Sequence, residues 1–127
     1  MRIVDFKGVT ETESIEQLET ILRRRSENDY NMFSLSHTNE EYPCLEIPVK
    51  GGIAALFYMP KEFDAGLRSM GRMPGIKRQE VSIFHLSTGE ELPVINDAVL
   101  PFSAALNAAK EFFLSKSPPQ SIEWFEL

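Results

Sequence analysis

Residues 99–127 read VLPFSAALNAAKEFFLSKSPPQSIEWFEL, and this stretch predicts the elements around which the rest of the chain is arranged. Apolar side chains recur in it at spacings of three and four residues, the pattern of an amphipathic helix. They are Phe102, Ala105, Leu106, Ala109, Phe112 and Phe113. Pro101 suits the first helical turn, where a missing amide is tolerated, and Lys116 suits the last turn. Pro118-Pro119 prevents any continuation, so the chain must turn there.

The residues after this turn favour a closing strand over 121–127. In a pleated strand, Ile122 and Trp124 lie on one side, while Glu123 and Glu126 lie on opposite sides. A tryptophan on a closing strand belongs more often to a core than to a binding surface. We therefore expect Trp124 to pack inward.

The remaining elements follow from alternation, helical spacing and turn residues. The predicted strands cover 2–7, 32–36, 42–49, 53–59 and 79–86, and a first helix begins near residue 15. With the C-terminal elements, the order is β-α-β-β-β-β-α-β. Hairpins with only two helices are typical of an α+β fold. We therefore predict a mainly antiparallel sheet of about six strands, with both helices packed on it.

Local signals refine this outline. Either Thr10 with Glu13 or Ser14 with Gln17 can cap the first helix, and Arg23-Arg24-Arg25 suits its carboxyl end. Pro43 and Pro48 suggest that strand 42–49 lies at an edge or contains a bulge. Residues 60–78 show no regular pattern, and a loop of this length is usually functional. We regard them as a candidate contact loop.

Length and composition fit one domain over residues 1–127, large enough to bury its own core. Cys44 is the only cysteine, which excludes an internal disulfide and favours a reducing compartment. No apolar run approaches the roughly 20 residues of a membrane-spanning helix. Met1-Arg2-Ile3-Val4-Asp5 places charge where an export signal would be apolar. We expect a cytoplasmic protein with no membrane partner.

The net charge is −6, and it is unevenly distributed. Residues 1–64 and 80–127 carry −5 each, whereas residues 65–79 carry +4 from Arg68, Arg72, Lys77 and Arg78. An acidic body repels phosphate backbones, so direct nucleic-acid binding is disfavoured. Such a surface suits a basic protein partner, although acidity also serves solubility.

The residues do not form a recognisable catalytic, cofactor or metal site. His37 and His85 lie far apart in the chain without nearby zinc-ligand spacing, and no glycine-rich phosphate loop is present. His37 and Cys44 could meet across a hairpin, but a buried inert cysteine is the simpler interpretation. The sequence therefore favours binding over catalysis and predicts no metal or cofactor.

The C-terminal half resembles the deaminase-toxin immunity proteins of bacterial polymorphic toxin systems. The resemblance lies in Pro101, the alanine-spaced helix with Glu111 and Phe112, Pro119 and the final strand with Trp124. It also includes Gly51-Gly52 leading into Leu56-Phe57-Tyr58, and the glycines Gly66 and Gly71. The resemblance covers residues 50–127. The matched residues have structural roles and are not expected to contact a partner.

This resemblance implies neutralisation of a cognate toxin, typically a nucleic-acid deaminase, by non-covalent binding that blocks its active site. Acidic loop tips would then meet a basic groove of the toxin, gaining association rate by electrostatic steering. The candidate contacts are Glu40, Glu41, Glu62, Asp64, Glu90 and Glu91. The identity of the toxin and the oligomeric state are left open.

Two other functions remain as alternatives. A small enzyme could use His37 with Cys44, or His85 with a nearby acid. A homo-oligomeric structural module could pair the predicted edge strand 42–49 with its copy.

Overall fold

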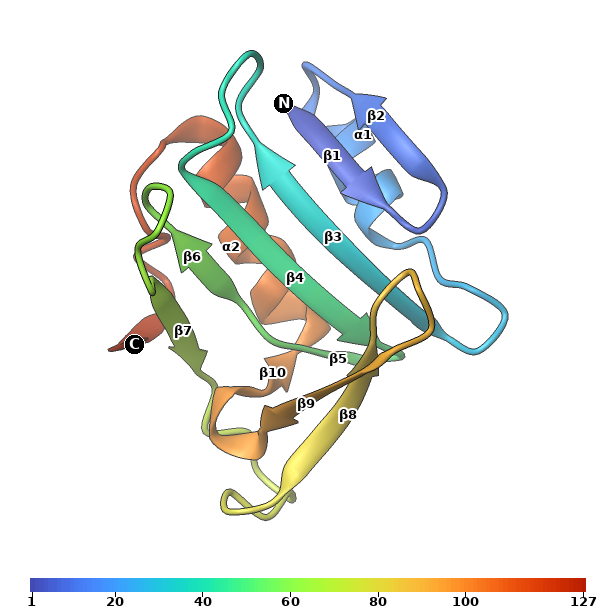
Figure 1. Ribbon diagram of the computed structural model, residues 1–127, viewed down its shortest axis with the longest axis vertical. Helices are drawn as coiled ribbons and strands as arrows, with labels where there is room; N and C mark the ends of the chain where they lie inside the picture. The colour runs from blue at the N-terminus through green and yellow to red at the C-terminus, as the bar shows by residue number, and fades with distance from the viewer.

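The computed structural model describes residues 1–127 and contains two α-helices, one short 3-10 helix and eleven strands (Figure 1). The helices are α1 (Ile15–Leu22), η1 (Asn96–Ala98) and α2 (Phe102–Leu114). The strands are β1 (Arg2–Asp5), β2 (Gly8–Glu11), β3 (Tyr30–Ser36), β4 (Cys44–Lys50), β5 (Ile53–Ala54), β6 (Phe57–Met59), β7 (Leu67–Met70), β8 (Val81–His85), β9 (Glu91–Ile95), β10 (Leu100–Pro101) and β11 (Glu123–Glu126). No helix is long and apolar enough to cross a membrane.

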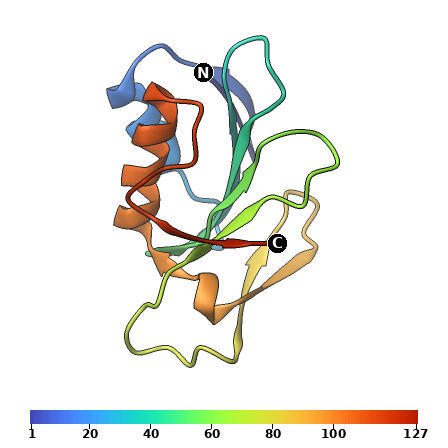
Figure 2. The ribbon, with the colours of Figure 1, turned by 90° about the vertical axis from the view of Figure 1, so that its left-hand side faces the viewer.

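The main sheet has the order β11-β7-β6-β4-β3-β1-β2, and every pair in it is antiparallel. Short strands β5 and β10 extend it beside the end of β4, whereas β8 and β9 form a separate hairpin. Figure 2 shows both α-helices on one face of the sheet. The predicted α+β architecture is therefore confirmed, with more strands than the expected six.

The main core lies between the sheet and the two helices. Alternate residues of the central strands point into it, and they include Ile3, Phe33, Leu35, Leu45, Ile47 and Val49. Leu18, Ile21 and Leu22 of α1 and Ala105, Leu106, Ala109 and Phe112 of α2 pack against them. The apolar spacing of α2 is confirmed as a buried face, and Trp124 packs against the same core as expected.

A smaller core lies on the opposite face of the sheet, under the β8–β9 hairpin. Phe84 and Val94 of the hairpin pack with Ala55, Ala98 and Val99. The hairpin thus covers one end of the face opposite α1 and α2, where β8 contacts β3 and β4. We call this face of the sheet the open face.

The prediction that strand 42–49 lies at an edge is wrong. β4 pairs with β3 on one side and with β5 and β6 on the other. Pro48 is accommodated because its neighbour is interrupted between Ala54 and Phe57, so no ladder partner requires the missing amide. The carbonyl of Pro48 accepts from Ala55 N at 3.2 Å. Because β4 is paired on both sides, it cannot pair with a second copy of the chain as the homo-oligomeric alternative requires.

The patternless stretch 60–78 contains a strand that the sequence did not reveal. β7 is only four residues long, and its buried member is the polar Ser69. The Ser69 hydroxyl donates to Ala98 O at 2.6 Å and accepts from Leu56 N at 3.0 Å. A hydroxyl in place of an apolar side chain removes the alternation on which strand prediction depends. Strands β2 and β9 were missed as well.

The ends of the helices agree in part with the predictions. Ser14 caps α1, its hydroxyl accepting from Gln17 N at 3.2 Å, whereas Thr10 lies in β2. Arg25 donates to Leu22 O at 2.8 Å, so the arginine run does serve the carboxyl end of α1. Lys116 lies beyond the end of α2 rather than in its last turn.

Candidate functional site

The open face is the part of the sheet that no helix covers. Its side chains alternate with those of the core, so Ser34 of β3 and Cys44 and Glu46 of β4 point toward it. In Figure 2 the loops 37–43 and 60–66 and the β8–β9 hairpin project on this side, away from the helices. A partner approaching this side meets the loops and the hairpin first.

Glu46 lies in the middle of the open face without a cationic partner. Its Oε1 accepts from the Ser34 hydroxyl at 3.0 Å and lies 3.9 Å from the Cys44 sulfur. Burial raises the pKa of this carboxyl, and the two hydrogen bonds oppose the rise only in part. Burial, reinforced by the Glu46 charge, raises the pKa of Cys44 to about 11. Cys44 is therefore a protonated thiol with little nucleophilic character.

The loop 37–43 is fastened to the end of α2 by two contacts. His37 Nε2 donates to Phe112 O at 2.9 Å, and Lys116 Nζ pairs with Glu40 Oε1 at 2.5 Å. Glu40 thus has a cationic partner within the chain, which reduces the charge it offers to another protein. Glu41 and Tyr42, on the arm of the loop that leads into β4, are exposed.

The loop 60–66 presents a fully exposed aromatic ring. Phe63 is 98% exposed and has a left-handed backbone, with φ of +64°. Asp64 accepts from Gly66 N at 2.8 Å, which closes a tight turn beside it. Gly66 has φ of +81°, and a Cβ there would lie 2.4 Å from Tyr58 O, so only glycine fits.

A hollow of about 340 Å³ opens beside this loop. It is lined by the acidic residues Asp64 and Glu126 and by Tyr58, Leu67, Pro118 and Leu127, which supply apolar surface. Tyr58 and Leu67 pack on the main core, so the hollow opens on the helical side of loop 60–66 and not on the open face. An acidic hollow with an apolar floor suits the charged head and alkyl stem of a lysine or arginine side chain.

The structure divides the six acidic residues predicted as contacts into two groups. Ser36, Cys44 and Met59 are cross-strand neighbours, so the loops that follow Ser36 and Met59 leave the same end of the sheet. These loops carry Glu40, Glu41, Glu62 and Asp64. Glu90 and Glu91 lie at the β8–β9 turn, near the Tyr30 end of β3, where His85 packs on Tyr30. The fold brings four of the acids together and sets two apart.

The basic residues of the 65–79 stretch are paired within the chain. Arg68 and Arg78 both contact Asp97, at 3.7 and 2.5 Å. Arg72 pairs with Glu123 at 3.3 Å, and Lys77 pairs with Glu80 at 3.6 Å. This stretch is therefore no free cationic patch, and it adds little to the recognition of an acidic partner.

The residue pairs considered for catalysis are not assembled. His37 packs on Phe112 on the helical side of the sheet, whereas Cys44 points to the open face and contacts Glu46. His85 packs on Tyr30, and its buried Nδ1 has no hydrogen-bond partner, so no acid engages that nitrogen. No group of three or more histidine, cysteine, aspartate and glutamate side chains could hold a metal ion.

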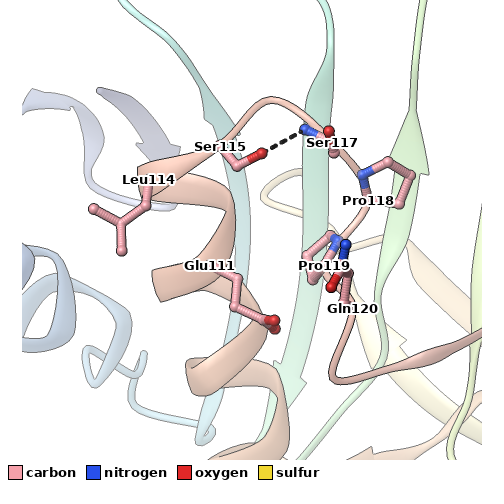
Figure 3. Close-up of a pocket in the computed structure, with 7 residues that line it drawn as sticks. All are labelled: Glu111, Leu114, Ser115, Ser117, Pro118, Pro119 and Gln120. Carbon is pink, nitrogen blue, oxygen red and sulfur yellow. Dashed lines mark hydrogen bonds between the residues drawn. The ribbon is translucent and has the colours of Figure 1, made fainter.

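A second hollow lies between α2 and residues 115–120, where Glu111 faces the proline turn (Figure 3). Glu111 is its only charged residue, and its carboxylate accepts from Ser121 N at 3.3 Å. Trp124 Nε1 donates to Pro119 O at 2.8 Å across the same turn. Glu111, Pro119 and Trp124 thus hold the last strand against α2, which is a structural role.

Comparison with known proteins identifies a relative over nearly the whole chain. No family model matches the sequence. The chain is 29% identical over 123 residues to the double-stranded DNA deaminase immunity protein of Burkholderia cenocepacia, covering 97% of each. The chain is thus a relative of a deaminase immunity protein. The resemblance first seen in residues 50–127 is confirmed, and the similarity covers 97% of the chain.

Proposed function

We propose that this chain is an immunity protein that neutralises a bacterial toxin by stoichiometric, non-covalent binding. The observation that carries the proposal is the similarity over 97% of its length to a deaminase immunity protein. The toxin we propose is a nucleic-acid deaminase, which the chain meets in the cytoplasm. The protonated thiol of Cys44 and the separation of His37 from Cys44 fit a binding role.

The charge of the open side supports inhibition by occupation of a substrate groove. An enzyme that acts on a polyanion needs a basic groove, and an acidic protein is attracted to it over a distance set by the ionic strength. Glu41, Glu62 and Asp64 are the carboxylates best placed for this, with Glu40 partly compensated by Lys116. Glu90 and Glu91 could touch the same partner from the far end of the open face.

Co-expression with the toxin encoded beside this gene tests the proposal directly. We expect the chain to rescue growth, to form a 1:1 complex and to abolish base deamination in vitro at equimolar concentration. A toxin that is neither bound nor inhibited by the purified chain would overturn the proposal, as would the absence of any toxin gene beside it.

The acidic loop tips are tested by charge reversal. A Glu41→Lys/Glu62→Lys variant is expected to associate at least about tenfold more slowly at low salt, because like charges suppress steered encounter. The Glu90→Lys/Glu91→Lys variant carries the same change of charge at the other end of the sheet. Unchanged association of both variants would show that these carboxylates do not steer the partner.

A further inference from the structure

We propose that loop 60–66 is the anchor of the toxin interface, with Phe63 inserted into an apolar pocket of a basic toxin groove and a toxin lysine or arginine in the adjacent hollow. This inference rests on the proposed function and identifies the surface that binds the toxin. It concerns residues 60–66, Tyr42 and the hollow lined by Asp64 and Glu126.

Phe63 is the most exposed large apolar side chain of the protein. It is 98% exposed, compared with 74% for Leu114 and 57% for Val9. A phenyl ring left in water forgoes the free energy of burial, and large aromatic residues are the commonest anchors of protein interfaces. The ring packs against no other part of the chain, so a partner that buries it gains the free energy of removing it from water.

Hydrogen bonds fix the backbone of the loop around Phe63. The Asp64 side chain accepts from Gly66 N, Asp64 N donates to Lys61 O at 3.3 Å, and Leu127 N donates to Gly66 O at 3.0 Å. The left-handed backbone at Phe63 is unfavourable for a bulky residue. A position that needs φ of +64° for folding alone would be better filled by glycine or asparagine, so the phenyl ring has another use.

The surroundings of Phe63 are acidic, which selects a basic occupant. Glu62 and Asp64 flank it in sequence, and Asp64 and Glu126 share the wall of the hollow. Tyr42 lies in the neighbouring loop, because Cys44 at the start of β4 pairs with Met59, after which loop 60–66 begins. Burial and then the charges of Cys44, Glu62 and Glu41 raise the pKa of Tyr42. Phe63 between Glu62 and Asp64, and Tyr42 after Glu41, combine aromatic surface with negative charge. This combination matches a groove that carries cationic side chains and surface for stacking bases.

The test uses the intact chain and the deaminase domain encoded beside it, with the deaminase of the Burkholderia cenocepacia relative as a second probe. Phe63→Ala is expected to raise Kd at least about 30-fold, as loss of a central aromatic anchor does. Leu114→Ala is the matched control, because Leu114 is exposed at the end of α2, and it should change Kd less than about threefold.

A second variant separates binding from folding. Phe63→Asn suits the left-handed backbone, so its melting temperature should equal or exceed that of the wild type while its affinity falls like that of Phe63→Ala. Asp64→Asn/Glu126→Gln keeps the turn acceptor and removes two charges. It should weaken binding about tenfold and reduce the salt dependence.

The outcomes distinguish this inference from the proposed function. A wild-type chain that inhibits the toxin while both Phe63 variants bind within about threefold of it would overturn the anchor and leave the immunity function standing. A wild-type chain that binds neither deaminase would overturn the immunity function and this interface with it.

Discussion

His37 of loop 37–43 donates from Nε2 to the backbone oxygen of Phe112, 75 residues further along the chain, at 2.9 Å. The two rings also pack, with centroids 5.0 Å apart. Since Phe112 is the buried residue of the last turn of α2, one imidazole joins the helical layer to a loop that borders the open face. The loop segment with Glu41 and Tyr42 is thereby positioned before any partner arrives, which lowers the entropic cost of binding.

His37→Ala should destabilise the protein by about 1–3 kcal/mol, because it leaves a carbonyl of α2 with one donor fewer and removes the packing on Phe112. Urea unfolding measures the loss. His37→Gln is the control, since its amide nitrogen can occupy the place of Nε2 and should recover part of the stability. Equal stability of the alanine variant and the wild type would contradict the fastening role of His37.

Gly71→Ala should cost about 3 kcal/mol or more, because a Cβ there would lie 1.7 Å from the backbone oxygen of Val99. The close approach joins the end of β7 to the segment before α2, where Gly71 N donates to Asp97 O at 2.8 Å. Thermal unfolding is the measurement. Gly52→Ala is the matched control, with no atom within 4 Å of its Cβ, and should lie within about 0.5 kcal/mol of the wild type.

The sequence predicted elements whose signal is local and missed those whose stability is tertiary. Ser14 and the apolar spacing of α2 are readable because caps and helical periodicity concern neighbours in the chain. β7 was invisible because Ser69 is buried through hydrogen bonds to Leu56 and Ala98, residues distant in sequence. Pro48 led to the wrong prediction of an edge strand. A proline indicates an edge when its strand has no neighbour on that side, but here the neighbouring strand is only interrupted opposite Pro48.

The candidate site was predictable as a set of loop tips but not as an arrangement. Two features of the site depend on the fold of the whole chain. Glu40 is paired with Lys116, and Glu90 lies at the other end of the sheet from Glu62. Tyr30, Tyr42, Phe63 and Trp124 are all possible aromatic anchors in the sequence, and only the fold shows that Trp124 packs against the core and that Phe63 is fully exposed. Its position between Glu62 and Asp64, in a loop with no apolar pattern, was the available clue.

Asp97→Asn should lower the melting temperature at neutral pH, because the carboxylate holds Arg78 and Arg68, and both Arg68 and Asp97 are mostly buried. The hydrogen bond from Arg78 is the largest influence on Asp97 and lowers its pKa below 3.8. Burial opposes this effect, and the charges of Arg78, Arg68 and Arg72 make smaller contributions that lower the pKa further. A lowered pKa means stability that is present above the unfolded value of 3.8 and lost as pH falls through the folded value.

The melting temperatures of wild type and Asp97→Asn should therefore converge as the pH falls below about 4 and differ most at pH 6–8. Glu123→Gln is the control, since its pair with Arg72 is exposed and should contribute little at any pH. A constant difference between Asp97→Asn and wild type across this pH range would contradict the ion-pair origin of the effect.

Glu46→Gln should stabilise the free protein at neutral pH and weaken its binding to a basic toxin. Burial raises the pKa of Glu46 above 4.5, so the folded state binds the proton more tightly than the unfolded chain and the carboxylate is destabilising above the folded pKa. This cost disappears below pH 4.5, so the variant should be more stable at pH 7 and indistinguishable from wild type near pH 4. Glutamine keeps an acceptor for Ser34, which leaves charge as the only large change.

Melting temperatures across pH 4–8 measure the effect of Glu46→Gln on stability, and Kd for the toxin measures its effect on binding. A variant that gains stability without losing affinity would show that the open face does not use the Glu46 charge for recognition.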